Sequence, residues 1–139
     1  MIIVSACLCG DNCKYDGKNN YSGKVMEFLS SREFIKVCPE IIAGLGTPRT
    51  PCEIRDGKVI SMKEDDLTEK FIFGARQVLE LAIKSNCTLA ILKDKSPSCG
   101  VNRIHDGTFK GVLMDGMGFT ASLLRKNGFK ILSELDYED

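Results

Sequence analysis

The sequence predicts an α/β fold with a mostly parallel sheet and flanking helices, that is, a Rossmann-like three-layer sandwich. Two observations predict it. Short apolar runs alternate along the chain with segments of helical periodicity, which is the order that builds parallel sheets. The first of these runs, residues 2–6, is apolar and β-branched, as expected for a strand buried on both faces. A length of 139 residues fits one domain with one core, so we expect a single domain over residues 1–139.

Four apolar runs predict the strands of this sheet. The predicted strands are residues 2–6, 34–37, 88–92 and 130–132. A hairpin is predicted over residues 53–61, because an Asp56-Gly57 pair separates two short extended runs.

Helical periodicity predicts three helices. They are a short helix that ends near Ser31, a long helix from Asp66 to about Ser85, and a last helix over residues 120–126. The long helix carries an apolar face from Leu67 to Ile83. Its predicted N-cap is Asp66, to which Glu69 reaches back. The Gly-, Asn- and Asp-rich residues 11–23 are expected to form a loop.

The composition excludes several classes of protein. The 19 Lys and Arg residues balance 19 Asp and Glu residues, so we expect no nucleic-acid partner. A hydrophobic fraction of 43% argues against disorder. No apolar run approaches the roughly 20 residues that span a bilayer. The N-terminus also lacks the charged segment that opens a signal peptide. We therefore expect a cytoplasmic protein with no membrane partner.

The chain is rich in cysteine. The seven cysteines are Cys7, Cys9, Cys13, Cys38, Cys52, Cys87 and Cys99. An odd number without a signal peptide indicates reduced thiols rather than a disulfide scaffold. Free cysteines often serve only as small buried hydrophobes, and we expect Cys52 and Cys87 to do so.

Three of the cysteines follow predicted strands. Cys7 comes just after the first strand, Cys38 just after the second, and Cys99 in the loop after the third. Ligands of an open parallel sheet bind beyond the carboxyl ends of its strands. We therefore predict that these three thiols converge on one site.

Three thiolates without an evident fourth ligand restrict the chemistry of this site. Soft thiolates select zinc, copper(I) or an iron–sulfur cluster, and an open coordination position marks a site that binds or transforms a ligand. We do not expect the single histidine, His105, to be a ligand. The spacing of Cys7, Cys9 and Cys13 fits neither a standard zinc pair nor a ferredoxin run.

Six short motifs spread over nearly the whole chain resemble one family. They are Ser5-Ala6-Cys7-Leu8-Cys9-Gly10, Tyr15-Asp16-Gly17, Val37-Cys38-Pro39-Glu40, Thr47-Pro48-Arg49, Lys93-Asp94-Lys95-Ser96-Pro97-Ser98-Cys99-Gly100 and Asp106-Gly107-Thr108-Phe109. Together they resemble the thiouracil desulfurase family, also known as domain of unknown function 523, in its stand-alone single-domain form.

The resemblance implies a 4Fe–4S cluster held by three cysteines, whose remaining iron binds the sulfur of a small thiolated base. The base, such as 2-thiouracil, would then exchange C=S for C=O without net redox change. The matching ligand positions are Cys7, Cys38 and Cys99. Many relatives have leucine at Cys9, and some have another residue at Cys13. These two are therefore spare thiols that could ligate, reduce or pack.

Catalytic roles are expected for a carboxylate and one of two serines. Glu40 lies two residues from a predicted ligand and is the candidate base that activates water. Its structural alternative is an acid that stabilises a helix N-terminus. Ser96 and Ser98 precede Cys99, and either hydroxyl could orient substrate or shuttle a proton. Turn formation explains both serines equally well.

Substrate binding is assigned to three further residues. Arg49 lies between two prolines and could bind an anion or a base carbonyl, and a surface salt bridge is the alternative. Tyr15 and Asp16 are expected to close the pocket, unless they only form a turn.

Two rival functions remain open. A zinc-dependent hydrolase or deaminase is the first, although the His-x-Glu and Pro-Cys-x-x-Cys signature of nucleobase deaminases is missing. The second is a non-catalytic cluster-binding or thiol redox-sensing domain. A brown colour after anaerobic purification separates a cluster from zinc, and turnover of a thiolated base separates an enzyme from a sensor.

Overall fold

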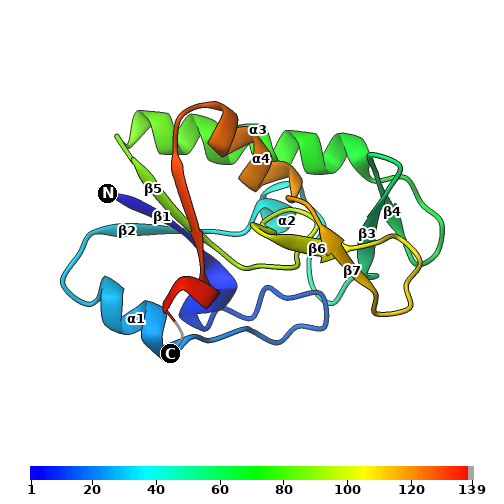
Figure 1. Cartoon of the computed structure of the whole chain (residues 1–139), viewed down its shortest axis with the longest axis horizontal. Helices are drawn as coiled ribbons and strands as arrows, with labels where there is room; N and C mark the ends of the chain where they lie inside the picture. Colours follow the sequence, from blue (N-terminus) through cyan, green and yellow to red (C-terminus); the bar gives the residue numbers. More distant parts are fainter. Residues whose placement is uncertain (138–139) are drawn as a thin grey trace.

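A computed structural model describes residues 1–137 and shows a central four-stranded sheet (Figure 1). Its strand order is β2 (Phe34–Val37), β1 (Ile2–Ser5), β5 (Leu89–Leu92) and β8 (Lys130–Ser133). All neighbouring strands in this sheet pair in parallel. The predicted α/β fold with a mostly parallel sheet is confirmed.

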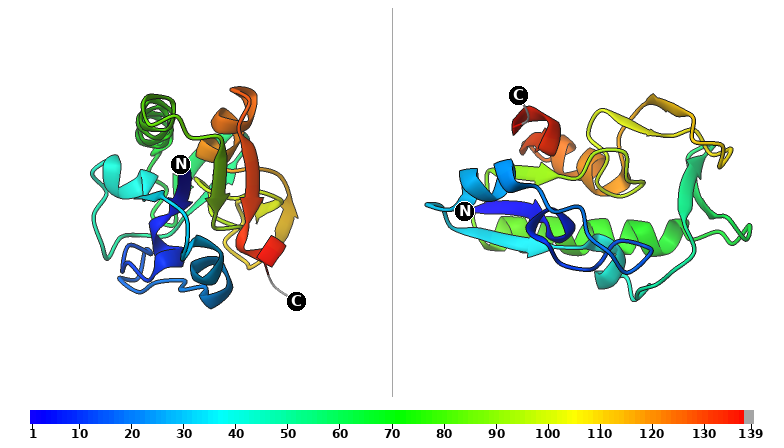
Figure 2. Two further views of the ribbon diagram at one scale, coloured as in Figure 1. Left: turned by 90° about the vertical axis from the view of Figure 1, so that its left-hand side faces the viewer. Right: turned by 90° about the horizontal axis from the view of Figure 1, so that it is seen from below.

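Helices cover both faces of the sheet (Figure 2). Helices α3 (Thr68–Lys84) and α4 (Phe119–Lys126) pack on one face. Helix α1 (Gly23–Leu29) and the C-terminal 3-10 helix η2 (Glu134–Tyr137) lie on the other. In the two central strands, β1 and β5, residues 2–4 and 89–92 are apolar without interruption because their successive side chains enter one of the two cores.

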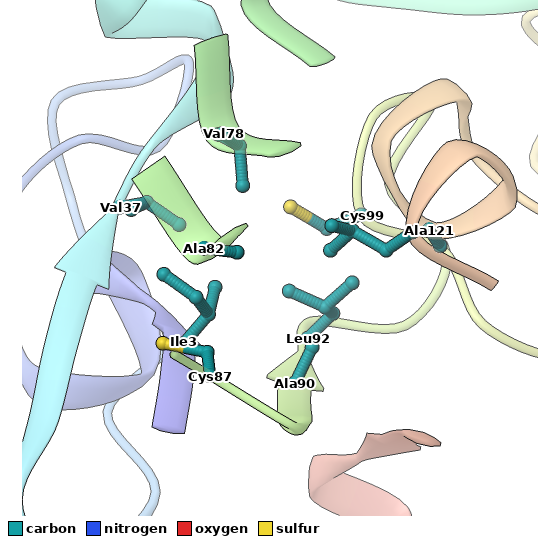
Figure 3. Close-up of a cluster of buried hydrophobic side chains, with 10 residues drawn as sticks. Ile3, Val37, Val78, Ala82, Cys87, Ala90, Leu92, Cys99 and Ala121 are labelled. Atoms are coloured by element: carbon teal, nitrogen blue, oxygen red, sulfur yellow. The ribbon is translucent and has the colours of Figure 1, made fainter. Parts of the chain in front are cut away.

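The core beneath α3 and α4 also contains two of the cysteines (Figure 3). Its buried residues are Ile3, Val37, Val78, Ala82, Cys87, Ala90, Leu92, Cys99, Ala121 and Leu124. Ile2 and Val4 point to the opposite core, which is the alternation that a strand imposes. Cys99 also packs in the core beneath α3 and α4, although it belongs to the loop after β5.

Two small antiparallel hairpins lie at the end of the molecule toward which β1 and β2 run (Figure 1). Strands β3 (Cys52–Arg55) and β4 (Lys58–Ser61) form the predicted hairpin. Its turn residues Asp56 and Gly57 both have positive φ, as a tight hairpin turn requires. The second hairpin, β6 (Arg103–His105) with β7 (Leu113–Asp115), was not predicted, because its strands are too short to show an alternating pattern.

Several predicted boundaries shift. The first strand ends at Ser5, and the chain passes directly into the 3-10 helix η1 (Ala6–Cys9). A short helix, α2 (Pro39–Ile42), follows Cys38. Among residues 1–137 no helix is long and apolar enough to cross a membrane.

The predicted capping of the long helix was wrong in detail. Leu67 is the N-cap residue, without a side-chain cap. Asp66 instead accepts hydrogen bonds from the backbone N–H and the hydroxyl of Thr68, at 2.9 and 2.6 Å. The apolar face also ends earlier than predicted, since Ile83 is 58% exposed.

Candidate active site

A cavity of about 460 Å³ lies beyond the carboxyl ends of β1, β2 and β5. In the order β2-β1-β5-β8, β2 lies on one side of β1, whereas β5 and β8, which come later in the chain, lie on the other side. The direction in which strands are added to the sheet therefore reverses at β1. Parallel sheets of this order bind ligands where the direction reverses, between the strands corresponding to β1 and β5. The cavity therefore occupies the position that the topology favours.

The structure places Cys7, Cys38 and Cys99 on the lining of this cavity. Cys7 lies in η1, directly after β1. Cys38 is the N-cap residue of α2, directly after β2. Cys99 reaches the cavity from the loop after β5 and is 6% exposed. The fold thus brings together the three thiols that follow neighbouring strands.

Cys13 also lines the cavity, and it lies between two of these thiols. Its thiol lies within hydrogen-bonding reach of the sulfur atoms of Cys7 and Cys38. The thiol of Cys38 also contacts the Cys13 carbonyl at 3.9 Å. The sequence indicated only a spare thiol at this position, because the path of the long loop that carries it has no local signal.

The thiols differ in their electrostatic environment. The hydrogen bond from Cys13, together with the backbone N–H of Ile41, lowers the pKa of Cys38 to about 7 despite its burial. The same partner lowers the pKa of Cys7. Burial raises the pKa of Cys99. Deprotonation to the thiolate, the form that binds metal, is therefore easier at Cys7 and Cys38 than at an ordinary cysteine.

Glu40 and Arg49 form a largely buried ion pair on the cavity wall. The Nε and Nη2 atoms of Arg49 each lie 2.8 Å from Oε2 of Glu40. Arg49 also donates to the carbonyls of Gly46 and Cys13, at 3.0 and 2.9 Å. Burial raises the pKa of Glu40, and the adjacent guanidinium offsets part of that effect.

The two predicted serines have different surroundings. Ser96 lines the cavity, and its hydroxyl accepts the backbone N–H groups of Ser98 and Cys99, both at 3.1 Å. Ser98 is buried, and its hydroxyl lies 2.7 Å from that of Thr120. Ser96 is therefore the serine whose side chain can reach a ligand in the cavity.

Tyr15 and Asp16 also differ. Tyr15 lines the cavity and is partly exposed. The carboxylate of Asp16 instead accepts the backbone N–H of Lys18 at 2.9 Å and pairs with Lys14 at 3.8 Å. Tyr15 thus lies where it can cover a ligand, and Asp16 stabilises the loop beside it.

The two hairpins supply a wall that sequence reasoning missed. This wall includes Glu53, Met62, His105 and Phe109. The Nδ1 atom of His105 is buried without a hydrogen-bond partner in the described part of the chain. The Asp106-Gly107-Thr108-Phe109 motif was the available signal, since it forms the loop that follows β6.

The fold and this cavity define a class of protein, an α/β enzyme domain with a thiol-lined site at the carboxyl edge of its parallel sheet. A family model described as 2-thiouracil desulfurase matches residues 2–136. The chain belongs to the 2-thiouracil desulfurase family, as its motifs indicated.

Two relatives are similar over nearly their whole length. The chain is 37% identical to the uncharacterized protein YbbK of Bacillus subtilis (strain 168), an alignment that covers 100% of this chain and 99% of that protein. A solved structure of a 4Fe-4S-dependent thiouracil desulfidase, TudS, superimposes with a TM-score of 0.91 at 39% identity. That match covers 97% of this chain and 91% of the other.

Proposed function

We propose that this protein is a 4Fe–4S-dependent desulfurase that converts C=S to C=O in a thiolated nucleobase such as 2-thiouracil. The observation that carries the proposal is the shared cavity of Cys7, Cys38 and Cys99, which come from the ends of three neighbouring strands. Membership of the desulfurase family supports the reaction. The similarity to a 4Fe-4S-dependent desulfidase supports the cofactor.

The donor set fits such a cluster. Thiolates are the usual ligands of iron–sulfur clusters, and two of the three thiols have a lowered pKa. Within residues 1–137, no three Cys, His, Asp or Glu side chains converge closely enough to hold one metal ion. A cluster does not require that convergence, because each thiolate binds a different iron atom. When bound, a cluster with three protein ligands supplies one Lewis-acidic iron for the sulfur of the substrate.

Glu40 is the proposed base. Among the residues that the structure describes, Arg49 contacts the carboxylate of Glu40 through Oε2, by a hydrogen bond and an ion pair. The other oxygen, Oε1, is the one we assign to a water molecule that attacks the thiocarbonyl carbon. Glu40 would accept the proton of this water as the new C–O bond forms, and the C–S bond would then break with sulfide as the leaving group, so that one water is consumed for each sulfide released.

Arg49 is proposed to act on the substrate through Glu40. Each of its three guanidinium nitrogens has an acceptor inside the protein, from Glu40, Gly46 or Cys13. A guanidinium held in this way keeps the carboxylate in one orientation, which is what a general base requires.

Two further side chains complete the proposed substrate site. The hydroxyl of Ser96 lies on the cavity lining beside Cys99 and can donate a hydrogen bond to the ring of the base. The ring of Tyr15 lies on the same lining and can stack on a planar substrate.

The test is anaerobic reconstitution followed by incubation with 2-thiouracil. We expect about four irons per chain and the release of uracil and sulfide in equal amounts. Cys99→Ser should abolish both, and Cys87→Ser, a change in the same core, should preserve both. Zinc without iron would contradict the cofactor, and a stable cluster that turns over no thiolated base would favour the sensor function.

A further inference from the structure

Asp94 is the centre of a hydrogen-bond network directly after β5. It is 2% exposed. Its Oδ1 atom accepts the backbone N–H groups of Lys95, Val101, Asn102 and Arg103, at 3.0, 2.9, 2.9 and 3.2 Å. Oδ2 lies 3.3 Å from the side-chain nitrogen of Asn102. One buried carboxylate thus binds both ends of the segment between Lys95 and Arg103.

Cys99 lies inside the segment that Asp94 closes. The Lys95 N–H also bonds the carbonyl of Arg103 at 3.1 Å, which draws the two ends of the loop together. Within the loop, the hydroxyl of Ser96 accepts the Cys99 N–H at 3.1 Å. The backbone around the Cys99 thiol is therefore fixed at both ends and in its middle.

Asp94 is suited to this role as an anion. Burial by itself would raise its pKa, but the backbone N–H donors outweigh that effect and hold the pKa below its ordinary range. An ionised carboxylate makes stronger hydrogen bonds than a neutral group. Hydrogen bonds also hold the backbone of Asp94 and of the residue before it. Glu134 accepts the backbone N–H of Asp94 at 2.8 Å, and the hydroxyl of Ser5 accepts the backbone N–H of Lys93 at 2.9 Å.

We infer that Asp94 is a positioning residue that holds the Cys99 thiol at the cavity before any cofactor binds. Without this carboxylate, four backbone N–H groups lose a charged acceptor and the loop opens locally. The consequence for cofactor binding rests on the proposed function, but the positioning itself does not.

Alkylation of the metal-free protein tests the positioning. Cys99 and Cys87 are matched reporters, because they are 6% and 7% exposed and lie in the same core (Figure 3). Only Cys99 belongs to the loop that Asp94 closes. The reduced protein is treated with iodoacetamide, and mass spectrometry follows the labelling of each cysteine with time.

In Asp94→Asn we expect the labelling rate of Cys99 to rise about tenfold or more, as expected when a local opening loses hydrogen bonds to a charged group. The rate for Cys87 should stay within about twofold of the parent rate, because local opening leaves the global equilibrium largely unchanged. An equal rise at both cysteines, or no rise at Cys99, would overturn the inference.

Two further variants keep the test decisive. Asp66→Asn is the control variant, because the carboxylate of Asp66 also accepts short-range hydrogen bonds, from Thr68, but lies far from this loop in the sequence. It should change the labelling rate of neither Cys99 nor Cys87. Asp94→Glu keeps the charge and displaces the carboxylate. It should give the same selective rise in the labelling rate of Cys99. If Asp94→Asn does not fold, the rates of Cys99 and Cys87 in Asp94→Glu test the inference in its place.

A second measurement separates this inference from the proposed function. After anaerobic reconstitution, iron loss to a chelator should be faster in Asp94→Asn than in the parent. Selective labelling of Cys99 with unchanged iron loss would confirm the positioning and remove Cys99 from the ligand set. Unselective labelling would overturn the positioning whatever the iron content.

Discussion

Arg49 donates a hydrogen bond from Nε to Oε2 of Glu40 at 2.8 Å, and its Nη2 atom forms an ion pair with the same oxygen at 2.8 Å. The side chains are only 10% and 15% exposed. Arg49 also bonds the carbonyl of Cys13, and Glu40 belongs to the helix that begins after Cys38. The ion pair therefore joins two of the thiol-bearing segments and balances the charge of the carboxylate in the cavity.

Removing the guanidinium should destabilise the protein strongly. Arg49→Ala leaves a buried carboxylate without its partner, which typically costs about 3–5 kcal/mol. In Glu40→Gln/Arg49→Ala the charge is absent, so the double variant should be more stable than Arg49→Ala alone. Urea unfolding measures the four proteins of this cycle. If Arg49→Ala and the double variant unfold with equal free energies, the ion pair contributes little to stability.

Glu40→Gln should separate cofactor binding from turnover. The amide keeps the volume of the side chain but cannot accept the proton of water. The cluster spectrum should therefore match the parent, and the rate of uracil formation should fall by about 10²–10⁴-fold, the usual contribution of a general base. A variant that turns over 2-thiouracil at the parent rate would assign Glu40 a structural role, and Ser96 would be the next residue to test.

Serine substitutions should distinguish ligands from the other thiols. Cys7→Ser, Cys38→Ser and Cys99→Ser should each prevent stable cluster binding, because two thiolates are too few. Substitution of the thiols outside the ligand set should preserve the cluster absorbance after reconstitution. These control positions are Cys9, Cys52 and Cys87.

Cys13→Ser is the informative comparison for the thiol between Cys7 and Cys38. A serine hydroxyl at this position can still donate a hydrogen bond to a neighbouring sulfur atom, so we expect this variant to keep the cluster. Loss of the cluster in Cys13→Ser, with retention in Cys99→Ser, would exchange the two residues in the ligand assignment.

The stability contributed by Asp94 should depend on pH in the acid range. Its folded-state pKa lies below the ordinary value of about 3.9. The stabilisation is therefore complete above the ordinary pKa and is lost as the pH falls through the lowered folded pKa. Urea unfolding of the parent and Asp94→Asn should show a difference in free energy that is constant near neutral pH and shrinks below about pH 4. A difference independent of pH would mean that charge is not involved.

A methyl group at Gly118 should disturb the loop that carries Cys99. A Cβ atom there would collide with the backbone carbonyl of Ser98 and approach the nitrogen of Cys99 to 2.8 Å. Gly118→Ala should therefore destabilise the protein by about 1–3 kcal/mol, as overpacking does. Gly23→Ala is the control, because a Cβ atom at this helix position meets only Tyr21, at 3.9 Å. Thermal unfolding should show a lowered midpoint for Gly118→Ala alone.

The sequence by itself determined the architecture of the sheet and which three thiols follow its strands. Uninterrupted apolar runs such as Leu89–Leu92 identify strands buried on both faces, and the parallel order of strands and helices places their carboxyl ends at one edge. The positions of Cys7, Cys38 and Cys99 relative to these strands follow from local pattern alone. The Asp56-Gly57 turn was equally local, because its two positive φ angles are a property of the dipeptide.

Only the tertiary structure decided which side chains meet in the cavity. Cys13 reaches Cys7 and Cys38 through a loop whose path has no repeating pattern. The two serines before Cys99 were indistinguishable in sequence, and packing against Thr120 removed Ser98 from the cavity. Asp94 resembles any acidic loop residue until the backbone N–H groups of residues 101–103 fold onto it. Periodicity reports which face of an element is buried, whereas contacts between loops depend on the closure of segments far apart in the chain.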